Sequence, residues 1–285
     1  MFPRFILVSL MVIFVQCLNA QQTTFEVPAT NSSAKVQQRV AATDIEVVYN
    51  RPNIKGRKIF GDLVPFGQVW RTGSDASTKI YFSTPVSLNG HEIDSGRYEL
   101  FTIPGKTEWT IILQKNKSQW GSYSYKQEND LLRFTSKPET IAHPVETFNI
   151  NFDKITSRSA EMSLSWEKTR VPVKITIDLN KTVIPKLEAS IKNDERKPYF
   201  RAAMFYFEND LDINRAAELM HLALKENPNH LGMLYRYALI LEKKGDKKEA
   251  IEASEKSMQL AQSASDELKH EYIKLNKVLL TKLKG

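Results

Sequence analysis

Arginine and tryptophan residues gather in one segment of this chain, residues 51–75, which reads RPNIKGRKIFGDLVPFGQVWRTGSD. The segment carries five lysines and arginines against two aspartates, and its glycines and prolines predict a loop. A guanidinium group binds a carboxylate through paired hydrogen bonds, and an indole offers a flat face to a sugar or aromatic ring. We therefore expect a ligand site here. The candidate ligand-binding residues are Arg51, Arg57, Trp70, Arg71, Asp75 and, from a later segment, Trp120.

The same residues have a purely structural interpretation. Arg51 and Arg71 can pair with Asp44, Asp62 or Asp75 and so hold a long loop against the rest of the fold. In that case Trp70 belongs to the hydrophobic core and the glycines of the segment set its turns. The sequence alone leaves both interpretations open.

Other catalytic patterns are absent from the sequence. The five histidines are scattered, with no H-E-x-x-H pair, so we expect no metal site and no cofactor. Ser74 follows a glycine but does not sit in a G-x-S-x-G elbow, and no glycine-rich loop has phosphate-binding spacing. A pair of carboxylates acting as in glycosidases stays open, because nothing in the sequence places two of them together.

The first 20 residues, MFPRFILVSLMVIFVQCLNA, have the form of a secretory signal peptide cleaved after Ala20. The apolar run from Phe5 to Val15 is shorter than the roughly 20 residues that cross a bilayer. Cys17 is the only cysteine, and Gln16 before it fits lipid attachment poorly. We therefore expect an exported, periplasmic or secreted protein with no disulfide and no lipid anchor. Its net charge of +7 is spread evenly, which argues against a nucleic-acid partner.

Residues 21–180 follow the two-residue period of β-strands. Apolar and polar residues alternate at 45–50, 147–152, 161–166 and 173–179, and Asn89-Gly90 predicts a tight hairpin turn. The run 109–113 is apolar on both faces, as in a central strand. These features predict an antiparallel β-sandwich of about ten short strands, with a small closed barrel as the alternative.

Residues 181–285 change to a helical period. The pattern Asp212-x-x-x-Ala216 returns as Asp246-x-x-x-Ala250, an offset of 34 residues. This is the period of tetratricopeptide repeats, which stack helix pairs and bind peptides or proteins. We expect a linking helix near 182–193, two repeats and a final helix at about 265–283. Such a tail predicts a protein partner.

Several motifs resemble one known family. They include RPxxKGRKIFGDLVPFG from Arg51, SGRYELFTIP at 95–104, WTIIL at 109–113, and LSWE at 164–167. The stretch 33–175 is thereby similar to the bacterial family known as domain of unknown function 2911. The resemblance implies a β-rich fold and export in Bacteroidetes-like bacteria, and it implies no established activity. This chain has Ser74-Asp75 where the family commonly has Ala-Asn.

Two functions follow as expectations. The first is a non-enzymatic envelope binding or scaffold module, whose tail docks a protein and whose sandwich holds a small polar ligand. The second is an enzyme acting on a carbohydrate or ester, with Arg51, Arg71 and Asp75 near its site. Convergence of these three side chains in one pocket beside Trp70 or Trp120 would favour the second.

Overall fold

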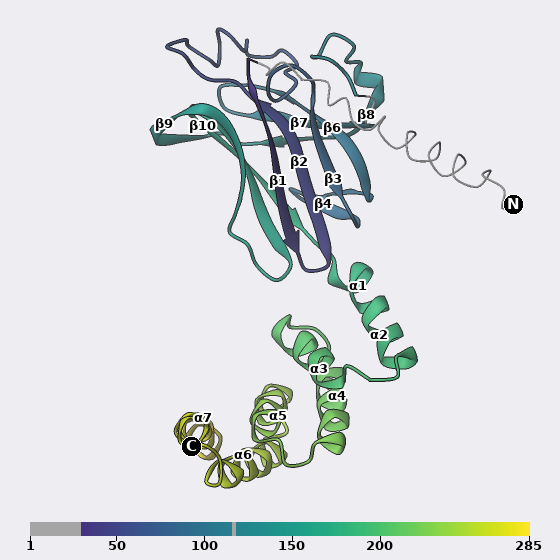
Figure 1. Ribbon diagram of the computed structural model, residues 1–285, viewed down its shortest axis with the longest axis vertical. Coiled ribbons are helices and arrows are strands. Elements are labelled where there is room, and N and C mark those ends of the chain that lie inside the picture. Colours follow the sequence, from purple (N-terminus) through teal and green to yellow (C-terminus); the bar gives the residue numbers. More distant parts are fainter. Residues whose placement is uncertain (1–29, 116–117) are drawn as a thin grey trace, which may run out of the picture.

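A computed structural model describes residues 30–115 and 118–285 (Figure 1). Two β-sheets stand at one end of the molecule and a run of helices at the other. The predicted signal peptide, with Cys17, lies outside the described residues. Among the residues described, no helix is long and apolar enough to cross a membrane.

The strands form two antiparallel sheets, so the predicted antiparallel β-sandwich is confirmed and the alternative of a closed barrel is not. The six-stranded sheet has the order β1 (Ser32–Val40), β2 (Thr43–Arg51), β3 (Thr78–Phe82), β6 (Gly96–Ile103), β7 (Trp109–Lys115) and β8 (Asp130–Ser136). The four-stranded sheet has the order β5 (His91–Ile93), β4 (Val86–Leu88), β10 (Ser159–Thr176) and β9 (Glu139–Asp153). A short 3-10 helix, η1 (Gln127–Asn129), precedes β8.

The alternation seen in the sequence decides which face of each strand is buried. In β2, Ile45, Val47 and Tyr49 are buried while the residues between them reach toward solvent. Trp109 and the run Ile111–Leu113 are buried on both faces of β7, which lies between β6 and β8. The turn between β4 and β5 is formed by Asn89-Gly90, both with positive φ, as Asn-Gly predicts.

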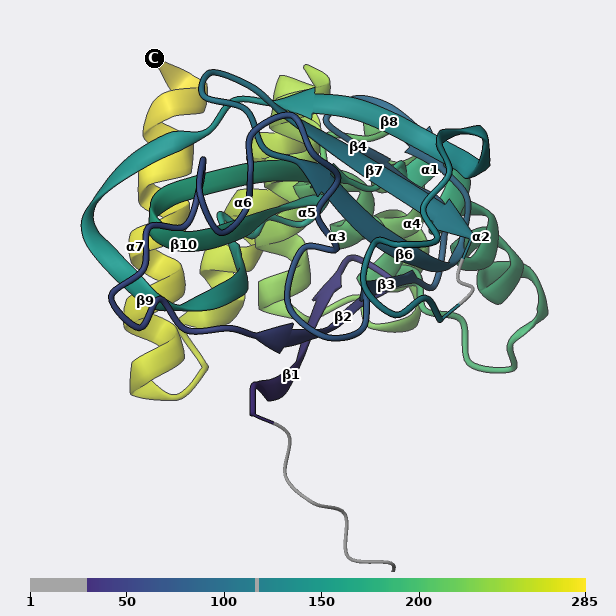
Figure 2. The same ribbon diagram turned by 90° about the horizontal axis from the view of Figure 1, so that it is seen from above.

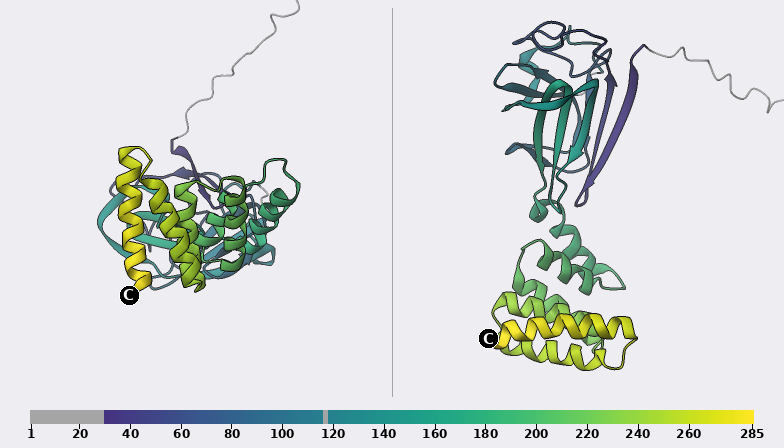
Figure 3. Two further views of the ribbon diagram at one scale, coloured as in Figure 1. Left: turned by 90° about the horizontal axis from the view of Figure 1, so that it is seen from below. Right: turned by 90° about the vertical axis from the view of Figure 1, so that its left-hand side faces the viewer.

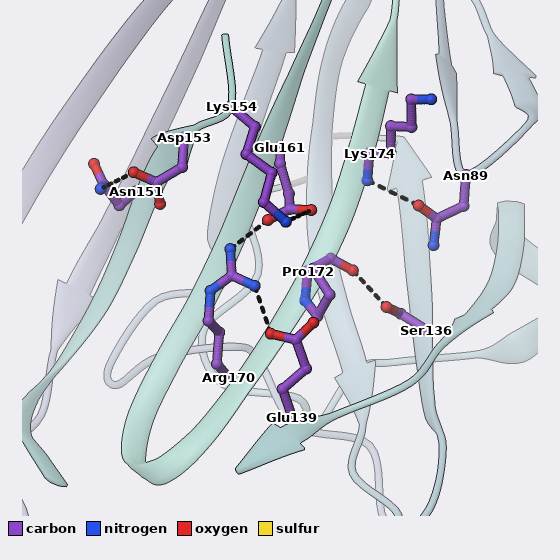
Figure 4. A network of polar contacts seen from close by, with 10 residues as sticks. All are labelled: Asn89, Ser136, Glu139, Asn151, Asp153, Lys154, Glu161, Arg170, Pro172 and Lys174. Carbon is purple, nitrogen blue, oxygen red and sulfur yellow. Dashed lines mark hydrogen bonds and ion pairs between the residues drawn. The ribbon is translucent and has the colours of Figure 1, made fainter. Parts of the chain in front are cut away.

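Polar contacts hold the long β9–β10 hairpin in place (Figure 4). The Arg170 guanidinium contacts Glu139 at 2.7 Å and also Glu161, whose second oxygen lies 3.0 Å from Lys154 Nζ. Burial alone would raise the pKa of Glu161, but the hydrogen bonds from Arg170 and Lys154 outweigh it and hold the pKa below its usual value. The hairpin therefore carries a charge network of its own.

An aromatic cluster closes the end of the sandwich. Phe60 packs edge-on against Trp70 and Trp109, with ring centroids 6.0 and 4.9 Å apart. Phe148 and Trp166 complete the cluster from β9 and β10. Because Phe60 and Trp70 belong to the long connection between β2 and β3, this cluster fixes that connection to both sheets.

The helical region begins directly after β10. Its elements are α1 (Leu179–Thr182), α2 (Ile184–Asn193), α3 (Tyr199–Glu208), α4 (Ile213–Glu226), α5 (Leu231–Lys244), α6 (Lys247–Ala261) and α7 (Asp266–Lys284). The helices lie at the end of the sandwich away from the β2–β3 connection, as the side view shows (Figure 3). Seen from above, they lie beneath the strands (Figure 2).

Small residues let neighbouring helices approach closely. Ala216 in α4 and Ala250 in α6 are each fully buried, 34 residues apart. Gly245 ends α5 in the left-handed conformation, with φ of 97°. The last two helices, α6 and α7, share a buried polar contact, in which Asn276 Nδ2 donates to Ser257 Oγ at 3.0 Å and Ser254 Oγ donates to Asn276 Oδ1 at 2.8 Å.

The sandwich and the helices touch through a few side chains. Phe205 and Leu211 pack against the core of the sandwich. Arg158, from the turn between β9 and β10, donates to the carbonyl of Asn209, and Lys181 lies 2.9 Å from Glu92. A hollow of about 630 Å³ remains beside these contacts.

Candidate functional site

The β2–β3 connection, residues 52–77, is held by backbone hydrogen bonds to the sheet beneath it. Trp70 N donates to Thr102 O at 2.7 Å, and Thr102 N donates back to Trp70 O at 2.9 Å. The Trp70 indole N–H donates to Gly73 O at 3.0 Å, and Thr72 Oγ1 donates to Thr102 Oγ1 at 3.1 Å. Because both neighbours of Arg71 are fixed in this way, its side chain starts from a rigid backbone.

A pocket of about 320 Å³ opens at this end of the sandwich. Its volume is at the lower end of the range usual for small-molecule sites, about 300–1,000 Å³. The wall combines aromatic, aliphatic, polar and cationic side chains. It is formed by Asn31, Pro52, Arg57, Leu63, Val64, Pro65, Gln68, Val69, Trp70, Arg71, Gly73, Ser74, Ser122 and Trp166.

Arg71 is the unusual member of this wall. Its Nε is buried and has no hydrogen-bond partner, and no ion pair of Arg71 occurs in the described part of the chain. A buried donor left unpaired costs about 1–3 kcal/mol, and more when it is charged. In the described part of the chain the two Nη atoms of Arg71 also have no protein partner, but they are not closed off in this way, so an anion in the pocket would meet these two atoms.

Arg57 is exposed and borders the same pocket. Its Nε donates to Ile54 O at 2.9 Å and its Nη2 donates to Asn53 O at 2.6 Å. These two bonds orient the guanidinium. Within residues 30–115 and 118–285, no protein group accepts from its Nη1, so this nitrogen can face a ligand.

A sequence model described as "Protein of unknown function (DUF2911)" matches residues 31–175. The chain belongs to this family. The matched region contains both sheets and every residue of the pocket wall, from Asn31 to Trp166, while the helical region lies outside it. No curated protein and no solved structure gave a match.

Of the six candidate residues, the DUF2911 domain brings Arg57, Trp70 and Arg71 into one pocket. Trp70 is both a core residue and part of the pocket wall, so the expectation of a core position is confirmed.

The other three candidates have different surroundings. Arg51 donates from Nε to Phe148 O at 2.9 Å and so joins β2 to β9. The carboxylate of Asp75 accepts from Ser74 Oγ at 3.0 Å and from Asn31 Nδ2 at 3.3 Å. Trp120 is 67% exposed and lies outside the pocket wall. Arg51 and Asp75 are therefore not part of the pocket wall that contains Arg71, although Asp75 contacts two of its residues, Asn31 and Ser74.

The alternative expectation, that arginines pair with aspartates to hold the loop, is wrong for both arginines. In the described residues, the Arg51 side chain binds a backbone carbonyl and the Arg71 side chain binds no protein group. Asp44 instead pairs with Arg39 at 3.5 Å. The connection is held by its aromatic side chains and backbone hydrogen bonds rather than by surface ion pairs.

Sequence reasoning did not find several residues of the wall, among them Asn31, Gln68, Ser122 and Trp166. Trp166 follows the alternation of Met162 and Leu164, which predicted burial and not a place in a pocket. Ser122 lies in the loop between β7 and β8, and no pattern in the residues around it predicts that it lies near the β2–β3 connection.

The pocket wall of the DUF2911 domain has no Asp, Glu, His or Cys among the described residues. Proton transfer and metal coordination depend on these side chains. The described residues also contain no group of three or more such side chains placed to hold a metal ion. With two guanidinium groups, indole surfaces and hydroxyl or amide groups, the wall can bind an anion and stack against a ring.

Proposed function

We propose that this protein is a binding module whose DUF2911 domain holds a small anionic ligand in the pocket at Arg71. The observation that carries the proposal is the Arg71 guanidinium in the wall of a concave site, with no hydrogen bond or ion pair to any side chain or backbone group of the described residues. Hydrogen bonds between a guanidinium and an anion are about twice as strong as neutral ones. The apolar side chains of the wall, among them Leu63 and Val64, lower the local dielectric, which strengthens such a contact further.

Binding fits the wall better than turnover does. An enzyme that cleaves a glycoside or an ester needs a nucleophile or a proton donor and acceptor at the bond. Ser74 is the candidate hydroxyl in the wall, and its Oγ donates to the Asp75 carboxylate; carboxylates are in general weaker bases than imidazole, and no histidine lies in the described wall. We therefore favour a non-enzymatic module over the carbohydrate- or ester-directed enzyme.

The helical region, residues 181–285, is proposed as a separate domain that docks a protein partner. The equivalent buried alanines, Ala216 and Ala250, and the helix–turn–helix order of α3 to α6 support two tetratricopeptide-like repeats. Residues 21–180 form the other domain in this proposal. Co-purification of a partner with the whole protein, lost when residues 181–285 are deleted, would support it.

Export to the periplasm or beyond is proposed from residues 1–20. Mass spectrometry of the protein isolated from its host tests this directly. A mature chain starting at Gln21 in the envelope or medium supports cleavage after Ala20, whereas a chain retaining Met1 in the cytoplasm contradicts it.

Ligand binding is tested by thermal shift against carboxylates and phosphate esters, each beside its neutral amide or alcohol. A ligand at about 100 times its dissociation constant adds about 2.7 kcal/mol to the free energy of unfolding, worth several degrees. Arg71→Met should abolish the shift, whereas the control Arg39→Met, which removes an exposed arginine on β1, should keep it. An unchanged shift in Arg71→Met would contradict the proposal.

A further inference from the structure

We propose that the ligand is an acidic oligosaccharide, with one uronic-acid residue in the Arg71 pocket and the next sugar rings on the exposed aromatic pair Trp120 and Tyr123. This inference rests on the proposed anion binding at Arg71. It adds the class of ligand and a second contact surface outside the pocket.

The exposed aromatic pair lies beside the pocket. Trp120 is 67% exposed and Tyr123 is 85% exposed, and between them Ser122 forms part of the pocket wall. Large aromatic side chains are seldom so exposed without a binding role, especially when they occur together. Leu63, at 45% exposure, is an exposed apolar residue of the pocket wall.

The loop that carries this pair is fixed to the β2–β3 connection. Gly121 N donates to Asp75 O at 3.0 Å, and Trp120 forms a β-bridge with Ala76. Gln119 is anchored to β6, because its backbone N and its Nε2 donate to the buried carboxylate of Glu99 at 2.6 and 2.8 Å. The aromatic pair is therefore presented on an ordered segment, which lowers the entropy lost on binding.

The chemistry of the pocket wall matches a sugar acid better than a bare anion. A sugar ring has a face of C–H groups and a rim of hydroxyls, and it stacks on indole and phenol rings. The wall supplies only small apolar edges of Trp70 and Trp166, which are 7% and 2% exposed, so stacking falls to Trp120 and Tyr123, while Gln68 and Ser122 are hydrogen-bonding groups of the wall. Arg71 supplies the charge for the carboxylate, so each kind of group on a uronic acid has a counterpart.

A membrane surface is the competing partner for exposed tryptophan and leucine. Peripheral membrane proteins place their cations where lipid headgroups can reach them, around the inserted apolar side chains. Here the unpaired cation is part of the wall of a hollow, and Arg71 is partly buried. A flat headgroup layer cannot enter a pocket of about 320 Å³, whereas the end of a sugar chain can.

The test measures binding of the full-length mature protein to four probes by titration calorimetry. The probes are galacturonate, its trimer, the neutral trimer maltotriose, and vesicles of phosphatidylglycerol. We expect the galacturonate trimer to bind at least tenfold more tightly than galacturonate, and maltotriose to bind at least tenfold more weakly than the acidic trimer. Trp120→Ala and Tyr123→Ala should each weaken the trimer about fivefold or more and leave galacturonate within twofold.

Two controls separate binding from folding. Val278→Ala removes an equally exposed apolar side chain from α7 and should change no affinity. Arg71→Met should remove binding of both acids, with a melting temperature no lower than that of wild type showing that the variant folds.

The outcomes separate this inference from the proposed function. If simple carboxylates bind through Arg71 but the acidic trimer has no advantage, or if Trp120→Ala leaves the trimer affinity unchanged, the sugar inference is overturned and anion binding stands. If the protein binds vesicles through Trp120 but does not bind the trimer, the sugar inference is overturned and the exposed aromatic pair is a membrane-binding surface. If no acid binds through Arg71, both proposals fail.

Discussion

The indole rings of Trp70 and Trp166 lie almost parallel, with their centroids 5.8 Å apart and an angle of 16° between their planes. Trp70 belongs to the β2–β3 connection and Trp166 to β10, so the stacked pair joins the loop segment to the four-stranded sheet. Both side chains also line the pocket. The stability of the sandwich and the shape of its candidate site therefore depend on the same contact.

Trp166→Ala should lower the free energy of unfolding by about 3–5 kcal/mol, because Trp166 is 2% exposed and its removal leaves a cavity. Urea denaturation measures this change. Trp120→Ala is the matched control, since its side chain is 67% exposed, and it should change the free energy by no more than about 0.5 kcal/mol. Equal losses in both variants would contradict the assignment of Trp166 to the core.

Gly73 has no room for a side chain. A Cβ at this position would lie 2.8 Å from the backbone oxygen of Asn50, and its φ is +156°. Gly56 also has a positive φ, but nothing lies within 4 Å of the equivalent Cβ. Gly56→Ala should therefore cost only the backbone strain, about 1–2 kcal/mol, and Gly73→Ala clearly more. Melting temperatures of the two variants, compared with wild type, decide this.

The Glu188 carboxylate joins α2 to α4 through Arg215, whose Nε lies 3.1 Å from Glu188 Oε1. The hydrogen bonds from Arg215 hold the pKa of Glu188 below its usual value, although burial opposes this. A lowered folded-state pKa contributes stability above the unfolded pKa of about 4.3, and this contribution is lost as the pH falls through the folded value.

Glu188→Gln should therefore lower stability at pH 7 and flatten its decline below about pH 4.5. Denaturation curves from pH 7 down to 3 measure both effects. Glu252→Gln, an exposed change in α6, serves as the control and should keep the wild-type acid profile. If Glu188→Gln keeps that profile too, the ion pair with Arg215 contributes nothing to acid stability.

Tyr206 predicts a second pH dependence, at the alkaline end. Burial raises the pKa of Tyr206 to about 12, and its hydrogen bond to Glu188 Oε1, at 2.8 Å, adds to the rise. Because the neutral phenol is favoured in the folded state, its contribution is complete below the unfolded pKa of about 10 and is lost as the pH rises through about 12.

Tyr206→Phe should remove this alkaline decline, and at neutral pH it should cost about 1.5–3 kcal/mol for a lost bond to a charged group. Stability measured by urea denaturation between pH 8 and 12 tests it. Tyr123→Phe is the control because Tyr123 is 85% exposed. A decline above pH 10 that is the same in Tyr206→Phe and wild type would show that another group causes it.

The sequence by itself determined the two kinds of structure and their order along the chain. The alternation of Met162, Leu164 and Trp166 predicts a strand with one buried face. Asn89-Gly90 predicts a tight hairpin turn in another part of the chain. Both predictions depend on neighbouring residues alone. The return of the Asp212–Ala216 pattern at Asp246–Ala250 predicts paired helices for the same reason.

Only the tertiary structure decided which arginine faces a pocket. Arg51 and Arg71 lie in the same basic segment, yet Arg51 is engaged by the carbonyl of Phe148, 97 residues away. Arg71 has no such partner, and the wall opposite it is formed by Trp166 and Ser122, from distant strands and loops. Periodicity reports the surroundings of a residue along its own strand, whereas a pocket is made by contacts between segments that the chain folds together.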